Sequence, residues 1–281
     1  MRRAVLLAAL AAVLADLGCE RPRAFVICHN ANCYGPTDPF LDDTVQALRR
    51  SLDLRWNGEP LVDGVELDSL WDPAGMRCAF AHDPSKADTS FGGVEAAEEV
   101  AQHLRDTAPE VGDRRFYVKL EMKPVSGPDG DPLTAQQARA HTDCALDMYE
   151  VLAAAAADTG RRLTVFFEST DPALVALVTE RPRYPGKNEG ENIETGIVVP
   201  IDADPPDGLE VDAVTIVWNE VSASRADEFR ELRSRDIDLI VWMYDADITV
   251  FEAIDLAEPR FVTTSEAPLV REWLGPAPRD E

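Results

Sequence analysis

Residues 62–84 read VDGVELDSLWDPAGMRCAFAHDP. The first part of this stretch alternates apolar with polar residues, which is the pattern of a β-strand. Glu66 and Asp68 are two positions apart, so they project from the same face of that strand. Two carboxylates held side by side repel each other, and we therefore expect a compensating positive charge next to them. The stretch ends at His82 and Asp83, directly after a second short apolar run.

Short apolar runs alternate with amphipathic helical patterns along the rest of the chain. Strands are predicted over residues 24–28, 65–68, 78–81, 116–121, 163–168, 193–199, 213–218, 239–243 and 260–263, and helices over 42–52, 94–107, 134–159, 172–180, 225–235, 249–256 and 267–274. Such alternation indicates a parallel sheet. Because no GxGxxG motif follows the first strand, we predict an α/β fold of the closed (β/α)8 TIM-barrel type rather than an open, doubly wound sheet.

The N-terminal residues differ in composition from the rest of the chain. Arg2 and Arg3 precede an uncharged run over residues 4–15. A basic start followed by about 7–15 apolar residues is typical of a secretory signal. Gly18 and Cys19 resemble a bacterial lipoprotein cleavage box, in which the cysteine is lipidated. We therefore expect a signal peptide over residues 1–19 and an exported, periplasmic or extracellular chain, with either ordinary cleavage or a lipid anchor at Cys19. Residues 20–281 are expected to form a single domain.

The charge of the chain excludes some partners. It has 52 acidic and 27 basic side chains, which gives a net charge of -25. This balance argues against binding of nucleic acid and against electrostatic docking on anionic lipid. An anionic substrate would need a local positive charge, such as a metal ion. No feature of the sequence identifies a protein partner.

Titratable residues are concentrated where the predicted strands end. Successive strand ends carry His29 with Asn30, then Glu66 with Asp68, then His82, and then Glu121 with Lys123. In a barrel of this type, the carboxyl ends of the strands carry the chemistry. Two of the four histidines in the chain lie at these ends, whereas His103 and His141 lie inside predicted helices. Packing alone does not require charged groups at four successive strand ends.

The order His-Asn, Glu-Leu-Asp, His-Asp and Glu-Met-Lys resembles the superfamily of phospholipase-C-like phosphodiesterases, which are (β/α) barrels. The chain is most similar to glycerophosphodiester phosphodiesterases, which carry H-R-G, E-x-D, H-D and E-x-K in this order. The Val-Trp pair at 241–242 and the segment 261–268 are also similar to that family. Asn30 and Ala31 replace the R-G pair, which removes an arginine that would bind phosphate. Phosphatidylinositol-type phospholipases begin with H-N, and sphingomyelinase-D-type enzymes use H-x-x-N, which His29 and Asn32 also satisfy.

The resemblance implies a metal-dependent phosphodiesterase acting on a small-molecule or lipid phosphodiester. Its metal ligands would be Glu66, Asp68 and Glu121, its catalytic acid and base His29 and His82, and its phosphate-binding or pocket residues Asn30, Lys123 and Trp242. An all-carboxylate set suits Mg²⁺ or Ca²⁺ rather than zinc. The two histidines would exchange protons with the attacking and leaving groups, a task that suits their unperturbed pKa of about 6.5.

Several alternatives remain open from the sequence. The enzyme could be a phosphatidylinositol-type phospholipase C or a sphingomyelinase-D-type phospholipase, or the chain could be a catalytically silent barrel lipoprotein that binds phosphorylated ligands. Glu66 and Asp68 could instead form a solvated strand edge. Lys119 could be a charge of the pocket or a salt-bridge partner.

Four cysteines remain besides Cys19. They are Cys28, Cys33, Cys78 and Cys144, and an even number in an exported chain permits disulfides. Cys33 and Cys78 would be the more credible pair because both flank the predicted site. Buried free thiols are the alternative.

Overall fold

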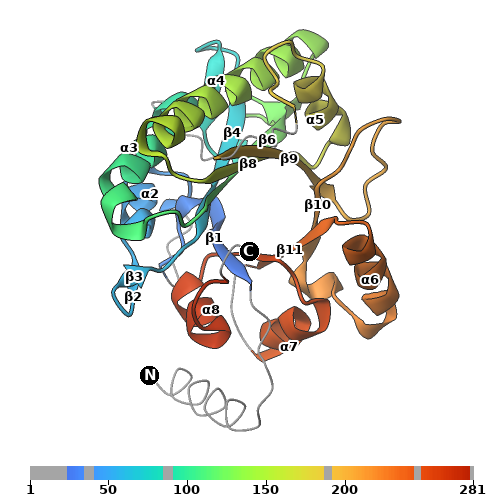
Figure 1. Ribbon diagram of the computed structural model, residues 1–281. Helices are drawn as coiled ribbons and strands as arrows, with labels where there is room; N and C mark the ends of the chain where they lie inside the picture. Colours follow the sequence, from blue (N-terminus) through green and yellow to red (C-terminus); the bar gives the residue numbers. More distant parts are fainter. Residues whose placement is uncertain (1–23, 35–40, 85–90, 187–191, 244–247, 279–281) are drawn as a thin grey trace, which may run out of the picture.

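The computed structural model describes residues 24–34, 41–84, 91–186, 192–243 and 248–278. Parallel strands form a closed barrel with helices around it, which confirms the predicted fold class (Figure 1). The barrel strands are β1 (Phe25–Cys28), β4 (Gly64–Asp72), β6 (Phe116–Ser126), β8 (Leu163–Glu168), β9 (Ile193–Pro200), β10 (Ala213–Val217), β11 (Asp238–Met243) and β12 (Phe261–Thr264). The ring closes because β1 pairs with both β4 and β12, and β4 pairs in turn with β6.

The outer layer consists of helices that follow the barrel strands along the chain. They are α2 (Val45–Leu52), α3 (Gly93–Val111), α4 (Ala135–Thr159), α5 (Pro172–Thr179), α6 (Ala226–Ser234), α7 (Ile248–Ala257) and α8 (Ala267–Leu274). The longest, α4, begins at a capping box: the Thr134 side chain accepts a hydrogen bond from the Gln137 amide, and the Gln137 side chain accepts one from the Thr134 amide. It ends at Gly160, whose φ of 68° is the left-handed conformation that glycine adopts without strain. The short strands β2 (Arg55–Trp56), β3 (Glu59–Pro60) and β7 (Asp131–Pro132) are additional to those predicted.

The strand predicted over residues 78–81 is present but is not a barrel strand. β5 (Arg77–Phe80) pairs antiparallel with the second half of β4, with Ser69 opposite Phe80. β1 pairs with β4 only at Gly64 and Val65. The same edge of β4 is therefore free at residues 69–72, where β5 pairs with it. The expectation that His82 ends a third parallel strand is therefore wrong. The hairpin instead returns the chain to Asp68, whose carbonyl accepts a hydrogen bond from the Ala81 amide at 3.2 Å.

The barrel interior is apolar at its base and charged above it. At the base, the Tyr117 ring lies 4.7 Å from that of Phe25 and 4.9 Å from that of Phe261, measured between ring centroids. Alternate residues of a strand face the same side, so β6 presents Lys119 and the charged residues beyond it on the face that carries Tyr117. Gly64 permits the close approach of β4 to β6, because a Cβ atom there would lie 2.2 Å from the Tyr117 carbonyl oxygen.

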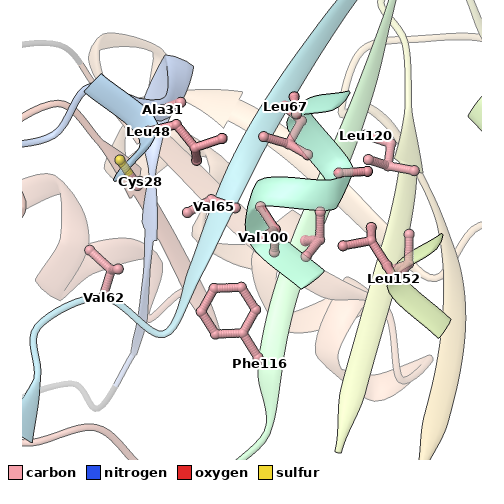
Figure 2. Packing of buried hydrophobic residues seen from close by; sticks show 14 of the residues in the cluster. Cys28, Ala31, Leu48, Val62, Val65, Leu67, Val100, Phe116, Leu120 and Leu152 are labelled. Atoms are coloured by element: carbon pink, nitrogen blue, oxygen red, sulfur yellow. The ribbon is translucent and has the colours of Figure 1, made fainter. Parts of the chain in front are cut away.

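The opposite faces of the same strands pack against the helices. Val65 and Leu67 of β4 and Leu120 of β6 pack with Val100 of α3 and Leu152 of α4 (Figure 2). All five side chains are at most 1% exposed. Burial of one such aliphatic side chain contributes about 1.5–3 kcal/mol. This packing fixes which face of β4 points outward and so turns Glu66 and Asp68 into the barrel.

Two disulfides join the described cysteines, and neither is the pair favoured from the sequence. Cys28 is bonded to Cys33, and Cys78 to Cys144. The expected Cys33–Cys78 bridge and the alternative of free thiols are therefore both wrong. The first bridge closes the turn after β1, because its cysteines are five residues apart. The second bridge joins β5 to α4, because Cys78 lies in β5 and Cys144 lies in α4.

The predicted signal peptide lies outside the described residues, as does the predicted cleavage or anchor site at Cys19. Among the residues that the structure describes, no helix is long and apolar enough to cross a membrane. Export and anchoring therefore stay predictions.

Candidate active site

Side chains at the carboxyl ends of the barrel strands line a cavity of about 560 Å³. Six of the eight site residues predicted from the sequence are part of this lining: His29, Glu66, His82, Glu121, Lys123 and Trp242. The other two lie directly behind it, because Asp68 contacts His82 and the Asn30 amide lies beside Glu66. The structure thus brings all eight residues together.

The three predicted metal ligands form one cluster. The parallel register of β4 and β6 places Asp68 beside Glu121. One carboxylate oxygen from each of Glu66, Asp68 and Glu121 lies within 4.8 Å of the others. Glu66 and Asp68 are 1% and 0% exposed, so the alternative of a solvated strand edge is wrong. Such a convergence of buried carboxylate oxygens can hold a hard divalent cation.

Two buried lysines supply positive charge beside the repelling carboxylates Glu66 and Asp68. The Nζ atom of Lys119 lies 2.7 Å from oxygens of both Glu66 and Glu168. The Nζ atom of Lys123 lies 2.5 Å from Glu121 and 3.4 Å from Asp68. Burial lowers the pKa of each lysine, but the neighbouring carboxylates outweigh burial and hold both pKa values above their usual range. Lys119 is therefore both a charge of the pocket and a salt-bridge partner.

The lysines do not neutralise the cluster completely. Four carboxylates, of Glu66, Asp68, Glu121 and Glu168, share two ammonium groups. Burial and the charge of Asp68 raise the pKa of Glu121 to about 8, even though Lys123 acts in the opposite direction. Burial raises the pKa of Glu66, but Lys119 and His29 outweigh it and keep the pKa below its usual value. The carboxylates of the cluster outnumber its ammonium groups, which favours binding of a cation.

Asn30 lies in a turn of left-handed backbone between β1 and the carboxylates. Its φ is 48° and that of Ala31 is 54°, a region that asparagine tolerates better than most residues. Its amide lies 3.2 Å from Glu66 Oε1 and 3.1 Å from Asp68 Oδ2. With the nitrogen inward, the amide donates to both oxygens; with the oxygen inward, it completes a cage of oxygens that only a cation satisfies. The residues therefore fit a divalent metal.

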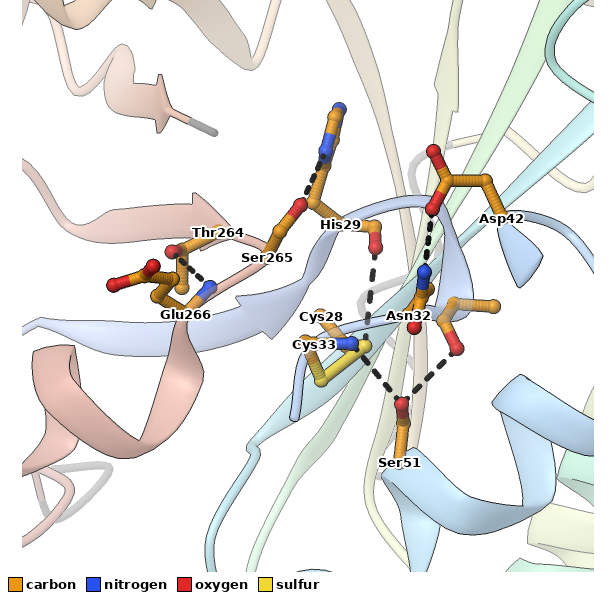
Figure 3. Close-up of a disulfide and its surroundings, with 10 residues drawn as sticks. Cys28, His29, Asn32, Cys33, Asp42, Ser51, Thr264, Ser265 and Glu266 are labelled. Carbon is orange, nitrogen blue, oxygen red and sulfur yellow. Dashed lines mark hydrogen bonds between the residues drawn. A yellow bond between two sulfur atoms is a disulfide. The ribbon is translucent and has the colours of Figure 1, made fainter. Parts of the chain in front are cut away.

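The Cys28–Cys33 disulfide encloses this turn and the histidine at its start (Figure 3). The Ser51 hydroxyl of α2 holds the turn from the other side, because it accepts from the Cys33 amide at 3.2 Å and donates to the Ala31 carbonyl at 3.0 Å. A covalent bridge and two hydrogen bonds thus fix the segment that presents His29 and Asn30.

His29 is buried against aromatic and hydroxyl groups. Its Nδ1 atom lies 3.2 Å from the Ser265 hydroxyl (Figure 3), and its Nε2 atom lies 3.6 Å from Glu66 Oε1. The Trp242 ring stacks on the imidazole with 5.7 Å between centroids and an interplanar angle of 20°. Burial lowers the pKa of His29 below its usual value, although Glu66 and Asp68 oppose the shift. The ring is therefore neutral near pH 7.

His82 has the opposite electrostatic environment. Its Nδ1 atom lies 2.6 Å from Asp68 Oδ2. Burial lowers the pKa of His82, but the hydrogen bond and the charge of Asp68 outweigh burial and raise the pKa above its usual value. The centroids of the His29 and His82 rings are 6.4 Å apart. The site therefore holds one histidine that favours the neutral form and one that favours the protonated form.

Some residues of the site were not predicted from the sequence. Ser265 directly follows β12, so the rule that strand ends carry the chemistry would have identified it. Asp43 gave no signal, because it precedes a helix rather than follows a strand. The far wall of the cavity combines the apolar residues Pro200, Ile201, Ile216 and Val217 with the polar residues Asp202, Thr215 and Glu220. His141 lies outside the lining, as expected, and its Nε2 atom is 2.9 Å from the Ser69 hydroxyl.

No family model matches the chain, and no curated protein matches it by sequence. Solved structures do match it. One is a protein from Silicibacter pomeroyi assigned as a glycerophosphoryl diester phosphodiesterase. The two structures match over 90% of this chain and 94% of the other, with a TM-score of 0.58 and 11% sequence identity. Another is a glycerophosphodiester phosphodiesterase from Agrobacterium tumefaciens. The match covers 88% of this chain and 98% of the other, with a TM-score of 0.53 and 12% sequence identity.

A third match comes from a second branch that the sequence resembles, the phosphatidylinositol-type phospholipases. Over 92% of its length the chain is similar to 93% of a calcium-dependent phosphoinositol-specific phospholipase C from a Pseudomonas species, with a TM-score of 0.50 and 12% identity. At this level of identity the matches establish a shared fold. The predicted resemblance to phospholipase-C-like phosphodiesterases is therefore confirmed at the level of fold.

Proposed function

We propose that this protein hydrolyses phosphodiesters of the glycerophosphodiester or phospholipid-derived type, using a divalent cation and two histidines. One observation carries the proposal: two histidines with opposite pKa shifts lie edge to face, with 6.4 Å between ring centroids, at a cavity that also holds three clustered carboxylates. The names of the proteins that share the fold support the reaction class.

Glu66, Asp68 and Glu121 would hold the cation, with the Asn30 amide oxygen as a further ligand. When bound, a divalent cation polarises the non-bridging phosphate oxygens and stabilises the charge that develops on them. Lys123 lies at the same cluster and adds a positive charge at the phosphate. The cation and Lys123 would together bind the phosphate in place of the H-R-G arginine of the similar family, where this chain has Asn30.

The two histidines would divide the proton transfers. His29, whose pKa is lowered by burial, acts as the base that takes a proton from the attacking hydroxyl or water. His82, whose pKa is raised by Asp68, acts as the acid that donates a proton to the leaving alkoxide. Asp68 orients His82 because a carboxylate can only accept, so Nδ1 carries the shared proton. The stacked Trp242 ring restricts the orientation of His29.

The position of Asn30 favours a second candidate, a phosphatidylinositol-type phospholipase C. This activity would use a hydroxyl of the substrate next to the phosphate as the nucleophile and would release a cyclic phosphate. The sphingomyelinase-D-type alternative receives less support. Its H-x-x-N asparagine would be Asn32, which donates to Asp42 at 2.6 Å and is not part of the cavity lining.

The experiment that tests the proposal is ³¹P NMR of the reaction products. Purified protein with Mg²⁺ or Ca²⁺ would be incubated with glycerophosphocholine, glycerophosphoinositol and phosphatidylinositol. Phosphomonoester products support the first candidate, and a cyclic phosphate from the inositol substrates supports the second. His103→Gln is a matched control, because this histidine lies on α3 away from the cavity and its replacement should leave turnover unchanged. Binding of these substrates without turnover of any would contradict both candidates and favour a silent barrel.

A further inference from the structure

Asp43 is a buried carboxylate that the proposed mechanism does not use. Its side chain is 6% exposed, and neither carboxylate oxygen has a hydrogen-bond partner among the described residues. It precedes Thr44, the N-cap of α2, and its φ of 54° is left-handed. Its amide donates to the Asn30 carbonyl at 2.9 Å, which ties it to the turn beside the site. A carboxylate buried without a partner is costly and requires a physical explanation.

The orphaned carboxylate lies next to two groups of the active site. One oxygen of Asp43, one oxygen of Asp68 and one ring nitrogen of His82 all lie within 4.8 Å of one another. This triad is distinct from the Glu66, Asp68 and Glu121 cluster, and Asp68 is the only residue that belongs to both. Within the described part of the chain Asp43 forms no ion pair, and the nearby ammonium of Lys123 is already engaged by Asp68 and Glu121. A cation held between Asp43, Asp68 and His82 would supply the missing partner of both Asp43 oxygens.

We propose that Asp43, Asp68 and His82 form a second cation-binding position, which takes a borderline divalent ion of the Zn²⁺ type. The two positions differ in chemistry. Three carboxylates suit a hard ion such as Mg²⁺ or Ca²⁺, whereas an imidazole combined with two carboxylates suits zinc. Three protein ligands leave a fourth coordination site open to water, as in many zinc centres. Asp68 is shared, so it can place one oxygen toward each position.

Occupation of the second position has a consequence for the histidine. The Nδ1 atom of His82 now shares a proton with Asp68. A zinc-type ion that binds Nδ1 replaces that proton and removes the hydrogen bond that orients the ring. His82 then keeps its Nε2–H only as a neutral imidazole, which is a weaker acid than the imidazolium and donates poorly to the leaving alkoxide. This consequence rests on the proposed function and makes the second position inhibitory, whereas binding of the ion does not depend on that function.

The test is a Zn²⁺ titration followed by NMR of ¹⁵N-labelled histidine side chains, in excess Mg²⁺ to fill the all-carboxylate position. The resonance assigned to His82 Nδ1, identified by its absence in His82→Gln, should shift as zinc binds. Asp43→Asn should weaken zinc binding by at least about 10–100-fold, the range already seen for loss of an outer partner that only supports a ligand. Asparagine tolerates the left-handed backbone, so this substitution should preserve the fold. Asp43→Gly, which also tolerates that backbone, is the second variant and should weaken zinc binding at least as much.

Asp53→Asn is the matched control, because Asp53 is an exposed carboxylate at the other end of α2. The Asp53→Asn protein should bind zinc as tightly as the wild-type protein. The proposal is overturned if the His82 resonance does not move, or if both Asp43 variants bind zinc as tightly as the wild type. Failure of the proposed function would appear differently, as normal zinc binding in a protein without phosphodiesterase activity.

Discussion

The Nδ1 atom of His82 lies 2.6 Å from Oδ2 of Asp68, and the antiparallel β4–β5 hairpin creates this contact. Asp68 faces the barrel interior from β4, next to Glu121. One carboxylate therefore belongs to the predicted metal cluster and also accepts the hydrogen bond that orients His82, the proposed acid. Loss of Asp68 should consequently affect two functions at once, whereas loss of Glu66 or His82 should affect one.

The first prediction concerns the division of roles between the histidines. His82→Ala should lower turnover of glycerophosphodiesters by about 10²–10⁴-fold, the usual effect of losing a general acid or base. The same variant should lose much less activity on bis-p-nitrophenyl phosphate, because p-nitrophenolate leaves without a proton. His29→Ala should lose activity on both substrates. The measurement is kcat of each variant on each substrate, and an equal loss for His82→Ala on both would contradict its role as the acid.

The second prediction concerns the stability of the protein without metal. Repulsion between Glu66 and Asp68 alone would suggest that removing one carboxylate stabilises the fold. The structure indicates the reverse for Glu66→Gln, because the buried Lys119 would keep only Glu168 as a partner. The free energy of unfolding should fall by about 1.5–3 kcal/mol, the usual contribution of a hydrogen bond to a charged group.

Chemical denaturation in EDTA measures this change. Glu98→Gln, an exposed position on α3, is the control and should change stability little. A more stable Glu66→Gln protein would show that repulsion outweighs the ion pair. Calorimetric titration with Mg²⁺ or Ca²⁺ should also show weaker binding by this variant, because one of the three clustered carboxylates is lost.

The third prediction separates the two disulfides. The Cys78–Cys144 bridge closes a loop with a sequence separation of 66, and the Cys28–Cys33 bridge one of 5. In the chain-entropy model their loss costs about 4 and about 2 kcal/mol of stability, respectively. Replacing both cysteines of a pair by serine should therefore lower the melting temperature more for Cys78 and Cys144. Activity should fall more strongly for Cys28 and Cys33, because their bridge fixes the turn that carries His29. Melting curves and kcat of the two double variants check this, and an identical ranking in both measurements would count against it.

The fourth prediction concerns the pH dependence of stability. Burial lowers the pKa of His141 to about 4, although its contact with Ser69 opposes the shift. The unfolded chain, with a pKa of about 6.5, therefore binds more protons than the folded one between these values. Stability from this residue is fully present above pH 6.5 and is lost as the pH falls toward 4, by up to about 1.4 kcal/mol per pH unit. His141→Gln should show a shallower loss of unfolding free energy over this window, and unchanged pH dependence would contradict the assignment.

The sequence predicts most of the barrel because its signals are local. Alternation along β4 and β6 gives both the strands and the inward face that carries Glu66 and Glu121. The capping box at Thr134 and the terminal Gly160 give the ends of α4. The direction of β5 was not predictable, because a short apolar run has the same pattern in a parallel and an antiparallel strand.

The parts of the site that were missed depend on contacts between distant segments. The pairing of Cys78 with Cys144 follows from the packing of β5 beside α4, which the linear sequence does not contain. The ion pairs of Lys119 depend on the register of three neighbouring strands. Asp43 is buried beside Asp68 only because the turn after β1 folds back on β4, so no spacing rule could reveal it.

In the proposed function, a divalent cation at the Glu66, Asp68 and Glu121 cluster acts together with the two histidines to hydrolyse a phosphodiester. The most direct measurement is the initial rate of alcohol release from a panel of glycerophosphodiesters by metal-stripped protein, before and after addition of Mg²⁺ or Ca²⁺. We expect no detectable release without metal, restoration by at least one of the two ions, and no restoration in a protein that carries both His29→Ala and His82→Ala. Release at the same rate in EDTA, or restored release in the histidine double variant, would contradict it.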